Sequence, residues 1–156
     1  MMETRVSSGM SPMTPPRCWW LVGPTGIRKT STILKKHGLT NLYSPLVTSH
    51  SDGLWWDNYA GQPVLLLDEF NPGTVSLQVL LQILDGNPLL QLPVKGGSVY
   101  PSFTHVYVVQ NELQQYPHMA ASQQCALTRR VEPVFVADPE SVEAAIREDV
   151  APVPSP

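Results

Sequence analysis

The sequence is poor in cysteine and has no long apolar run. Its two cysteines, Cys18 and Cys125, are too few and too far apart for a disulfide scaffold, and the four histidines occur singly, without the spacing of a metal-binding motif. No stretch approaches the roughly 20 apolar residues of a membrane span, and residues 1–16 lack the pattern of a secretory signal. We therefore expect an intracellular, reducing environment, no metal site built from histidine or cysteine motifs, no membrane partner and no secretion.

The sequence also lacks a dense basic patch, and its net charge is −3. A nucleic-acid-binding surface is normally basic, so this charge argues against an extended contact with DNA. The acidic residues are concentrated near the C-terminus, however, and between Arg17 and Val136 there are eight basic and seven acidic residues. A contact with DNA would therefore have to be local.

With 156 residues, of which 42% are hydrophobic, the chain is long enough for one folded domain with flanking segments. Residues 1–16 are rich in Met, Ser, Thr and Pro and predict a disordered leader. We place the folded domain at 17–137, an acidic helical extension at 138–150 and a disordered Pro-rich tail at 151–156. No internal repeat is present.

Strand-like and helix-like segments alternate within the domain. Apolar, strand-like runs occupy 18–22, 63–70, 104–109 and 131–136, whereas 30–37, 75–84 and 119–128 have helical patterns. This alternation predicts an α/β fold with a mainly parallel central sheet. The segment 89–100 contains two strand-like pieces around Gly96 and Gly97, which predicts a protruding β-hairpin.

The run Trp19 to Val22 leads into a glycine-containing loop that ends in Lys-Thr. In a phosphate-binding loop, backbone N–H groups and the N-terminus of the following helix face phosphate oxygens. We expect Lys29 to reach the terminal phosphates and the Thr30 hydroxyl to join the coordination of Mg²⁺. The alternative is an ordinary Gly/Pro turn before a helix. The predicted nucleotide-binding residues are Gly23, Pro24, Thr25, Gly26, Ile27, Arg28, Lys29 and Thr30.

Two adjacent carboxylates follow the apolar run at 64–67. In a nucleotide hydrolase the first of them, Asp68, would hold the magnesium ion, and the second, Glu69, would polarise the attacking water. Alone, this pattern is common. It gains weight because a phosphate-binding loop lies upstream, so that two independent motifs predict the same metal–nucleotide complex.

The remaining candidates each have a simpler alternative. Asn111 follows an apolar strand and could contact a γ-phosphate or the lytic water, or it could cap a helix that starts at Glu112. Lys95, in the turn of the predicted hairpin, could equally be a solvated turn residue. The pair Arg129 and Arg130 could stabilise a transferring phosphoryl group in a neighbouring subunit, or could lie on a solvated surface. The cluster of Trp55, Trp56 and Tyr59 is most simply explained by packing under a loop.

The order of these motifs resembles the superfamily-three helicase domain of the replication-initiator (Rep) proteins of circovirus-like, circular single-stranded DNA viruses. The resemblance covers about residues 18–136 and rests on five motifs. They are Gly23-Pro24-Thr25-Gly26 with Lys29-Thr30 as Walker A; 55–59 and 61–62 leading into Leu65-Leu66-Leu67-Asp68-Glu69-Phe70 as Walker B; 93–99 as the B-prime motif; Val108-Val109-Gln110-Asn111 as motif C; and 126–131 as the arginine-finger region.

The resemblance implies a P-loop NTPase (AAA+-like) fold and an ATP-dependent DNA helicase that acts in rolling-circle replication, in the host nucleus, with ATP and Mg²⁺. It implies a homo-oligomer, a hexameric ring around single-stranded DNA. By resemblance, Lys29, Asp68, Glu69, Asn111 and Arg129 or Arg130 are catalytic, Thr30 and Asp68 hold the metal, and Lys95 with Gly96 and Gly97 binds DNA. Six copies of Lys95 around a channel would make a basic ring without a basic patch on the monomer.

Two features depart from the family pattern. The endonuclease domain of the full-length family members has no counterpart in 1–16, so we expect this chain not to nick DNA and a nuclease-bearing Rep protein to be a candidate partner. In addition, Arg28 stands where Walker A has glycine. A catalytically impaired nucleotide-binding or oligomerisation remnant is therefore the alternative function, and a small P-loop kinase is a third.

Overall fold

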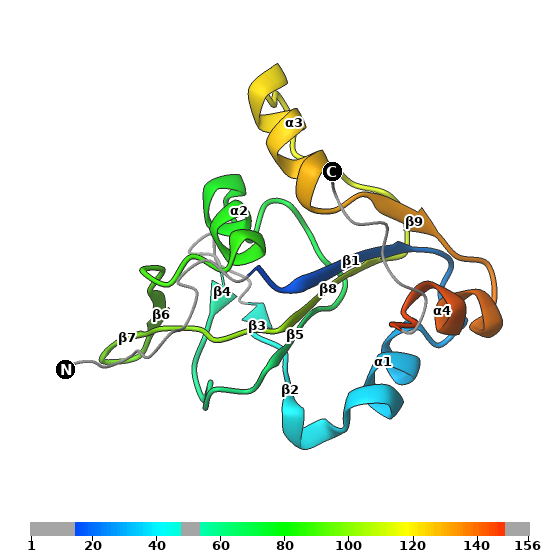
Figure 1. Ribbon diagram of the computed structural model, residues 1–156, viewed down its shortest axis with the longest axis horizontal. Coiled ribbons are helices and arrows are strands. Elements are labelled where there is room, and N and C mark those ends of the chain that lie inside the picture. The colour runs from blue at the N-terminus through cyan, green and yellow to red at the C-terminus, as the bar shows by residue number, and fades with distance from the viewer. Residues whose placement is uncertain (1–14, 48–53, 149–156) are drawn as a thin grey trace.

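Five parallel strands form the central sheet of the computed structural model, which describes residues 15–47 and 54–148 (Figure 1). In spatial order the strands are β2 (Leu42–Tyr43), β5 (Val64–Leu67), β8 (His105–Gln110), β1 (Arg17–Val22) and β9 (Pro133–Phe135). Every pairing between neighbours in this sheet is parallel. The prediction of an α/β fold with a mainly parallel sheet is therefore confirmed.

Helices cover both faces of this sheet. On one face lie α1 (Lys29–His37) and α4 (Pro139–Ala145), and on the other lie α2 (Leu77–Asp85) and α3 (Ala121–Arg130) (Figure 1). A short 3-10 helix, η1 (Leu39–Asn41), joins α1 to β2. The fold is consequently a three-layer sandwich in which helices cover both sides of the central strands.

Alternation along the strands produces the two cores. In β1, Trp20 and Val22 pack on the side of α2, whereas Leu21 packs on the side of α1. The four residues of β5 are all buried, as expected for a strand that is covered on both faces. In α4, Val142 and Ile146 just beyond it belong to the same core as Leu21, so part of the segment predicted as an acidic extension packs against the sheet.

The bounds of the central helices follow from their end residues. Basic residues occupy the last turn of α1, and Gly38, with a φ of 87°, donates its N–H to Leu34 O at 2.8 Å. The predicted end of this helix is thereby confirmed. Helix α2 begins after Ser76, whose hydroxyl accepts the N–H of Val79, and ends at Gly86 in the left-handed conformation.

Two small antiparallel pairs lie outside the central sheet. Strands β3 (Leu46–Val47) and β4 (Leu54–Trp55) form one pair. Strands β6 (Leu92–Val94) and β7 (Gly97–Val99) form the predicted hairpin, with Lys95 and Gly96 in its turn. Gly96 has a φ of 83°, a conformation that glycine adopts without steric cost.

The hairpin is fixed by the segment that follows β4. The N–H of Trp56 donates to Pro93 O at 3.2 Å, and Asp57 Oδ1 accepts the N–H of Lys95 at 2.7 Å. Trp56 is 2% exposed. Its ring, and that of Tyr59, lie in an aromatic cluster, which bears out packing as the explanation for these two residues. The other members of that cluster are Tyr43 and Phe103.

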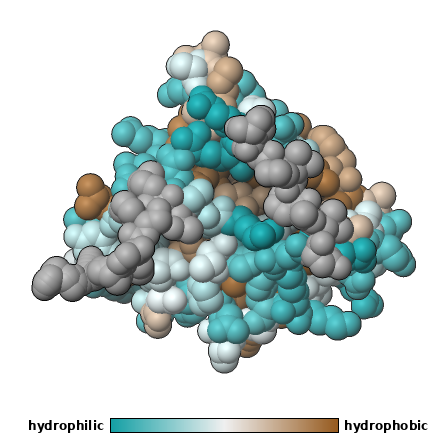
Figure 2. All heavy atoms as spheres, in the orientation of Figure 1, coloured by the Kyte–Doolittle hydropathy of each residue, from teal (hydrophilic) through white to brown (hydrophobic). Residues whose placement is uncertain are grey.

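The edge strand β9 carries exposed apolar side chains. Val134 is 43% exposed and Phe135 is 68% exposed. Figure 2 shows apolar surface at the position of β9.

Within 15–47 and 54–148, none of the helices has the length and apolar character that a membrane crossing requires. The predicted tail, residues 1–14 of the leader and the last two residues of the predicted extension lie outside the described residues.

Candidate functional site

A cavity of about 310 Å³ lies at the carboxyl edge of the sheet. Because β1, β5 and β8 are parallel, their C-terminal ends meet at this edge, together with the loop that joins β1 to α1. In open α/β sheets, ligands bind outside the carboxyl ends of the strands. The residues lining the cavity are Thr25, Gly26, Arg28, Lys29, Thr30, Ser31, Asp68, Glu69, Val109 and Asn111.

The loop between β1 and α1 is fixed by its first glycine. The N–H of Gly23 donates to Gln110 O at 3.1 Å, which ties the end of β1 to the end of β8. A Cβ at Gly23 would lie 2.3 Å from Val136 O and 2.9 Å from the Ile27 side chain. No residue with a side chain could occupy this position without displacing the backbone after β9.

The last residue of the loop, Arg28, adopts a left-handed backbone conformation, with φ 66° and ψ 38°. A residue with a Cβ pays roughly 1–2 kcal/mol for this conformation, whereas glycine does not. The glycine of a Walker A motif at this position is thus the residue that the observed backbone favours. Gly26 also has a positive φ, of 92°, which glycine adopts without steric cost. The side chain of Arg28 is exposed.

Lys29, the first residue of α1, is 6% exposed and its ammonium group has three acceptors. Lys29 Nζ donates to Gly23 O at 2.6 Å, to Pro24 O at 2.9 Å and to Asn111 Oδ1 at 3.2 Å. Burial lowers the pKa of Lys29, and the charge of Asp68 opposes this shift. An anion entering the cavity would take the place of these neutral acceptors and would offset the cost of burying the cation.

The two predicted carboxylates lie directly after β5 and line the same cavity as the loop. Asp68 is half-buried and its Oδ1 accepts the N–H of Glu69 at 3.0 Å. Glu69 is exposed and has a φ of 48°, a strained value for a residue with a side chain. The structure therefore brings both carboxylates and Thr30, which are distant in sequence, to one cavity.

The structure contradicts one of the two roles predicted for Asn111. No helix starts at Glu112 in the described chain, since the next helix, α3, begins at Ala121. The prediction that Asn111 caps a helix is therefore wrong. Its side chain instead contacts Lys29, which lies 82 residues away in the sequence.

The neighbouring Gln110, for which the sequence predicted no separate role, organises this strand end. It is 2% exposed, its Nε2 donates to Phe70 O at 3.2 Å, and its Oε1 accepts the indole N–H of Trp20 at 2.8 Å. Gln110 also exchanges hydrogen bonds with the backbone of Gln114. The sequence signal for this role was an amide at the end of an otherwise apolar strand. A buried amide requires hydrogen-bond partners for its donors and acceptors.

The remaining predicted residues do not reach this cavity within the described chain. Lys95 and Gly96 lie in the exposed hairpin turn, and Gly97 is the exposed first residue of β7. At the end of α3, Arg130 is paired with Asp85 and also donates to Ala126 O, whereas Arg129 is exposed.

The donor atoms at the cavity are suited to a hard cation. Thr30 and Asp68 supply hydroxyl and carboxylate oxygens, the ligand type that Mg²⁺ prefers. Comparison with known proteins assigns no function to this cavity. No family model matches the chain, and no curated protein matches it either.

Proposed function

We propose that the chain binds ATP with Mg²⁺ in this cavity and hydrolyses it, as the ATPase/helicase module of a viral replication-associated protein in rolling-circle replication. The observation that carries the proposal is the convergence of five side chains from three separate segments on one cavity. They are Lys29, Thr30, Asp68, Glu69 and Asn111. The helicase and viral assignments rest on the order of the motifs in the sequence, which the resemblance to the superfamily-three helicases describes.

Each of these residues has a role that follows from its position. Lys29 would exchange its two backbone acceptors for phosphate oxygens while α1 presents its N-terminus to the same anion. Thr30 and Asp68 would hold the magnesium ion, which neutralises charge on the phosphate oxygens. Glu69, exposed at the cavity, would orient the attacking water, and Asn111 would contact the terminal phosphate.

Single-stranded DNA and further copies of the chain complete the proposal. Lys95 lies in an exposed turn, so a ring of subunits could present several copies of it to a DNA backbone. The pairing of Arg130 with Asp85 leaves Arg129 as the better candidate for a contact with a neighbouring active site. A nuclease-bearing Rep protein would supply the nicking activity.

Two observations favour the alternative of an impaired nucleotide-binding or oligomerisation remnant. Arg28 imposes a side chain on a strained position of the loop, and Lys29 is already held by three acceptors. Both features oppose the movement of the loop and the ammonium group toward a phosphate. This alternative predicts binding without turnover.

Steady-state ATP hydrolysis, with and without single-stranded DNA, tests the proposal on the full chain. The helicase function predicts turnover that DNA stimulates and that Lys29→Ala lowers by about 100-fold or more. Lys35→Ala is the matched control, because Lys35 is exposed on the same helix and does not line the cavity. Turnover that is equal in the two lysine variants would contradict the proposed role of Lys29.

Arg28→Gly separates the two functions. If hydrolysis is absent in the unaltered chain but a fluorescent ATP analogue binds, and Arg28→Gly restores hydrolysis, the remnant function is correct. If neither protein binds the analogue, the cavity is not a nucleotide site. Arg129→Ala should lower turnover at unchanged stability, whereas Arg130→Ala should lower stability because it leaves Asp85 without its partner.

A further inference from the structure

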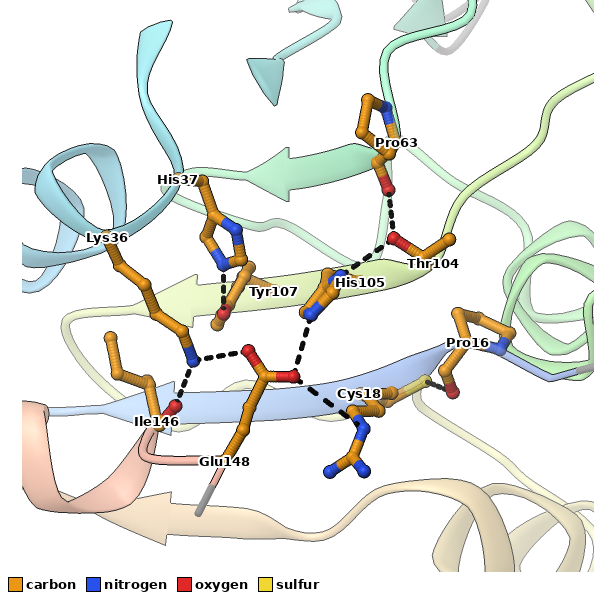
Figure 3. Close-up of polar contacts among 11 residues, drawn as sticks. Pro16, Cys18, Lys36, His37, Pro63, Thr104, His105, Tyr107, Ile146 and Glu148 are labelled. Carbon is orange, nitrogen blue, oxygen red and sulfur yellow. Dashed lines mark hydrogen bonds and ion pairs between the residues drawn. The ribbon is translucent and has the colours of Figure 1, made fainter. Parts of the chain in front are cut away.

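A second cluster of polar side chains lies at the amino edge of the sheet (Figure 3), and none of its members lines the cavity. It consists of His37 at the end of α1, His105 at the start of β8, and Glu148 beyond α4. Their potential ligand atoms all lie within 4.8 Å of one another. Three elements that are distant in sequence therefore present two imidazoles and one carboxylate to a common point.

The spacing of these atoms is close to that of a metal site. Zinc binds imidazole nitrogen and carboxylate oxygen at about 2.0–2.2 Å, which places tetrahedral ligand atoms about 3.4 Å apart. His105 Nε2 and Glu148 Oε1 are 3.0 Å apart, and the centroids of the two histidine rings are 4.7 Å apart with their planes inclined at 64°. The three ligand atoms, all within 4.8 Å of one another, would have to draw together by side-chain rotation to bind one ion.

Surrounding groups hold the three side chains in place. The other ring nitrogen of His105, Nδ1, is 2.8 Å from the Thr104 hydroxyl, and His37 Nε2 is 2.6 Å from the hydroxyl of the buried Tyr107 (Figure 3). Trp19 stacks on His105 and on Tyr107. Supporting contacts of this kind are what orient the ligands of metal sites.

The cations at Glu148 determine which metals can bind. Lys36 Nζ contacts Glu148 Oε2 at 2.8 Å, whereas Oε1 faces His105, so the lysine can keep its contact while Oε1 serves as a ligand. Arg17 Nε is 3.7 Å from Oε1, and its half-exposed side chain can turn toward solvent. With one carboxylate and two nearby cations, the site does not attract hard ions such as Mg²⁺, which depend on oxygen ligands and negative charge.

The two imidazoles decide the class of metal. Imidazole nitrogen is a ligand that suits ions of the zinc, cobalt and nickel type, and a single carboxylate beside it is compatible with the same ions.

We propose that His37, His105 and Glu148 form a three-ligand site for a divalent transition metal of the zinc class. The ion would join α1, β8 and the segment after α4 at the amino edge of the sheet, as a structural clamp. This site is independent of the proposed ATPase function, since it uses none of the residues that line the cavity.

Cobalt(II) titration of the full chain, freed of metal with a chelator, tests this site. Excess Mg²⁺ is included to occupy the oxygen ligands of the cavity. We expect one equivalent of Co²⁺ to bind with visible d–d absorption and without a thiolate charge-transfer band, and zinc to displace it. The absence of a bound equivalent in the unaltered chain would overturn the proposal, and so would a thiolate band.

Variants then identify the ligands. His37→Gln and His105→Gln should each weaken Co²⁺ binding by about 10-fold or more, whereas His118→Gln, an exposed loop histidine, should leave it unchanged. Lys36→Met should strengthen binding, since it removes a competing cation. Equal loss in all three histidine variants, or no loss in His37→Gln and His105→Gln, would contradict the assignment. Circular dichroism spectra of each variant distinguish lost binding from lost folding.

Discussion

The two edges of the sheet treat their polar side chains in opposite ways. At the carboxyl edge, Asp68 and Glu69 face a cavity and the loop before α1 has a left-handed residue, Arg28. At the amino edge, by contrast, His37 and His105 are bonded to neighbouring side chains and packed against aromatic rings. At the carboxyl edge, hydrogen-bond donors and acceptors and a strained backbone residue lie beside a cavity that a ligand could enter. At the amino edge, polar groups form contacts that hold helices on the sheet.

This difference separates a stabilising network at the amino edge from the proposed nucleotide site at the carboxyl edge. Strained backbone and exposed polar groups persist at sites where a ligand or reaction requires them, and they are compensated by packing elsewhere. Substitutions at the amino edge should therefore act by removing side-chain contacts, whereas those at the carboxyl edge should act through the backbone of the loop that bounds the cavity.

The largest expected effect is that of Gly23→Ala at the carboxyl edge. The added Cβ would lie 2.3 Å from Val136 O, so backbone must move. We expect a loss of about 3 kcal/mol in the free energy of unfolding, measured with urea. Gly97→Ala is the matched control, because a Cβ there meets nothing within 4 Å and the change should stay within about 0.5 kcal/mol. Similar losses in both variants would show that the close approach at Gly23 can relax.

Tyr107→Phe tests the amino edge. Tyr107 is 0% exposed and its hydroxyl contacts His37 Nε2 at 2.6 Å, so the variant leaves a ring nitrogen without this partner. We expect a loss of about 1–2 kcal/mol in metal-free buffer. Tyr100→Phe should cost almost nothing, because Tyr100 is 60% exposed. A Tyr107→Phe protein as stable as the unaltered chain would mean that the network at this edge is not stabilising.

The two edges also differ in how far the sequence predicts them. Apolar runs that end in Gly23 and Asp68 identify β1 and β5, and parallel strands necessarily bring their C-terminal ends to one edge, so the composition of the cavity followed from local patterns. The cluster of His37, His105 and Glu148 has no local pattern. It exists because α1, β8 and the segment after α4 pack together, and single-sequence periodicity carries no information on such distant contacts.

The backbone conformation of the loop could not be predicted from the sequence either. The presence of Arg28 in place of glycine showed that the position was unusual, yet only the structure shows its positive φ. Likewise, a polar residue after a strand was compatible with a helix cap at Asn111. The observed contact with Lys29 depends on the register of β8 beside β1, which sequence alone does not fix.

Alkaline pH should destabilise the protein through a thiol at the amino end of β1. Burial, assisted by the charge of Asp85 and opposed by that of Arg130, raises the pKa of Cys18 from 9.0 to about 12. The folded state therefore keeps the thiol protonated while the unfolded chain ionises, so this stabilisation is complete below pH 9 and is lost as the pH rises toward 12. We expect about 1 kcal/mol of loss between pH 9 and 10 from this group.

Cys18→Ala isolates that contribution. The variant lacks an ionisable group at this position, so its unfolding free energy should fall less over the same pH interval. Parallel slopes for the two proteins would contradict the assignment. As a second measurement, iodoacetamide should alkylate the exposed Cys125 well before Cys18 in the folded chain.

Arg28→Gly should produce the smallest change and the only gain. Glycine removes the steric cost of the left-handed conformation but adds backbone entropy to the unfolded chain, so the net increase should be about 0.5–1 kcal/mol. Arg28→Ala is the decisive control, because it removes the same charge beside Lys29 yet keeps a Cβ at a φ of 66°. If both variants gain equally in urea unfolding, charge repulsion rather than backbone strain is the cost of Arg28. If only the glycine variant gains stability, the cost of Arg28 is backbone strain in the loop. That strain is then located at the carboxyl edge, where the backbone borders the cavity.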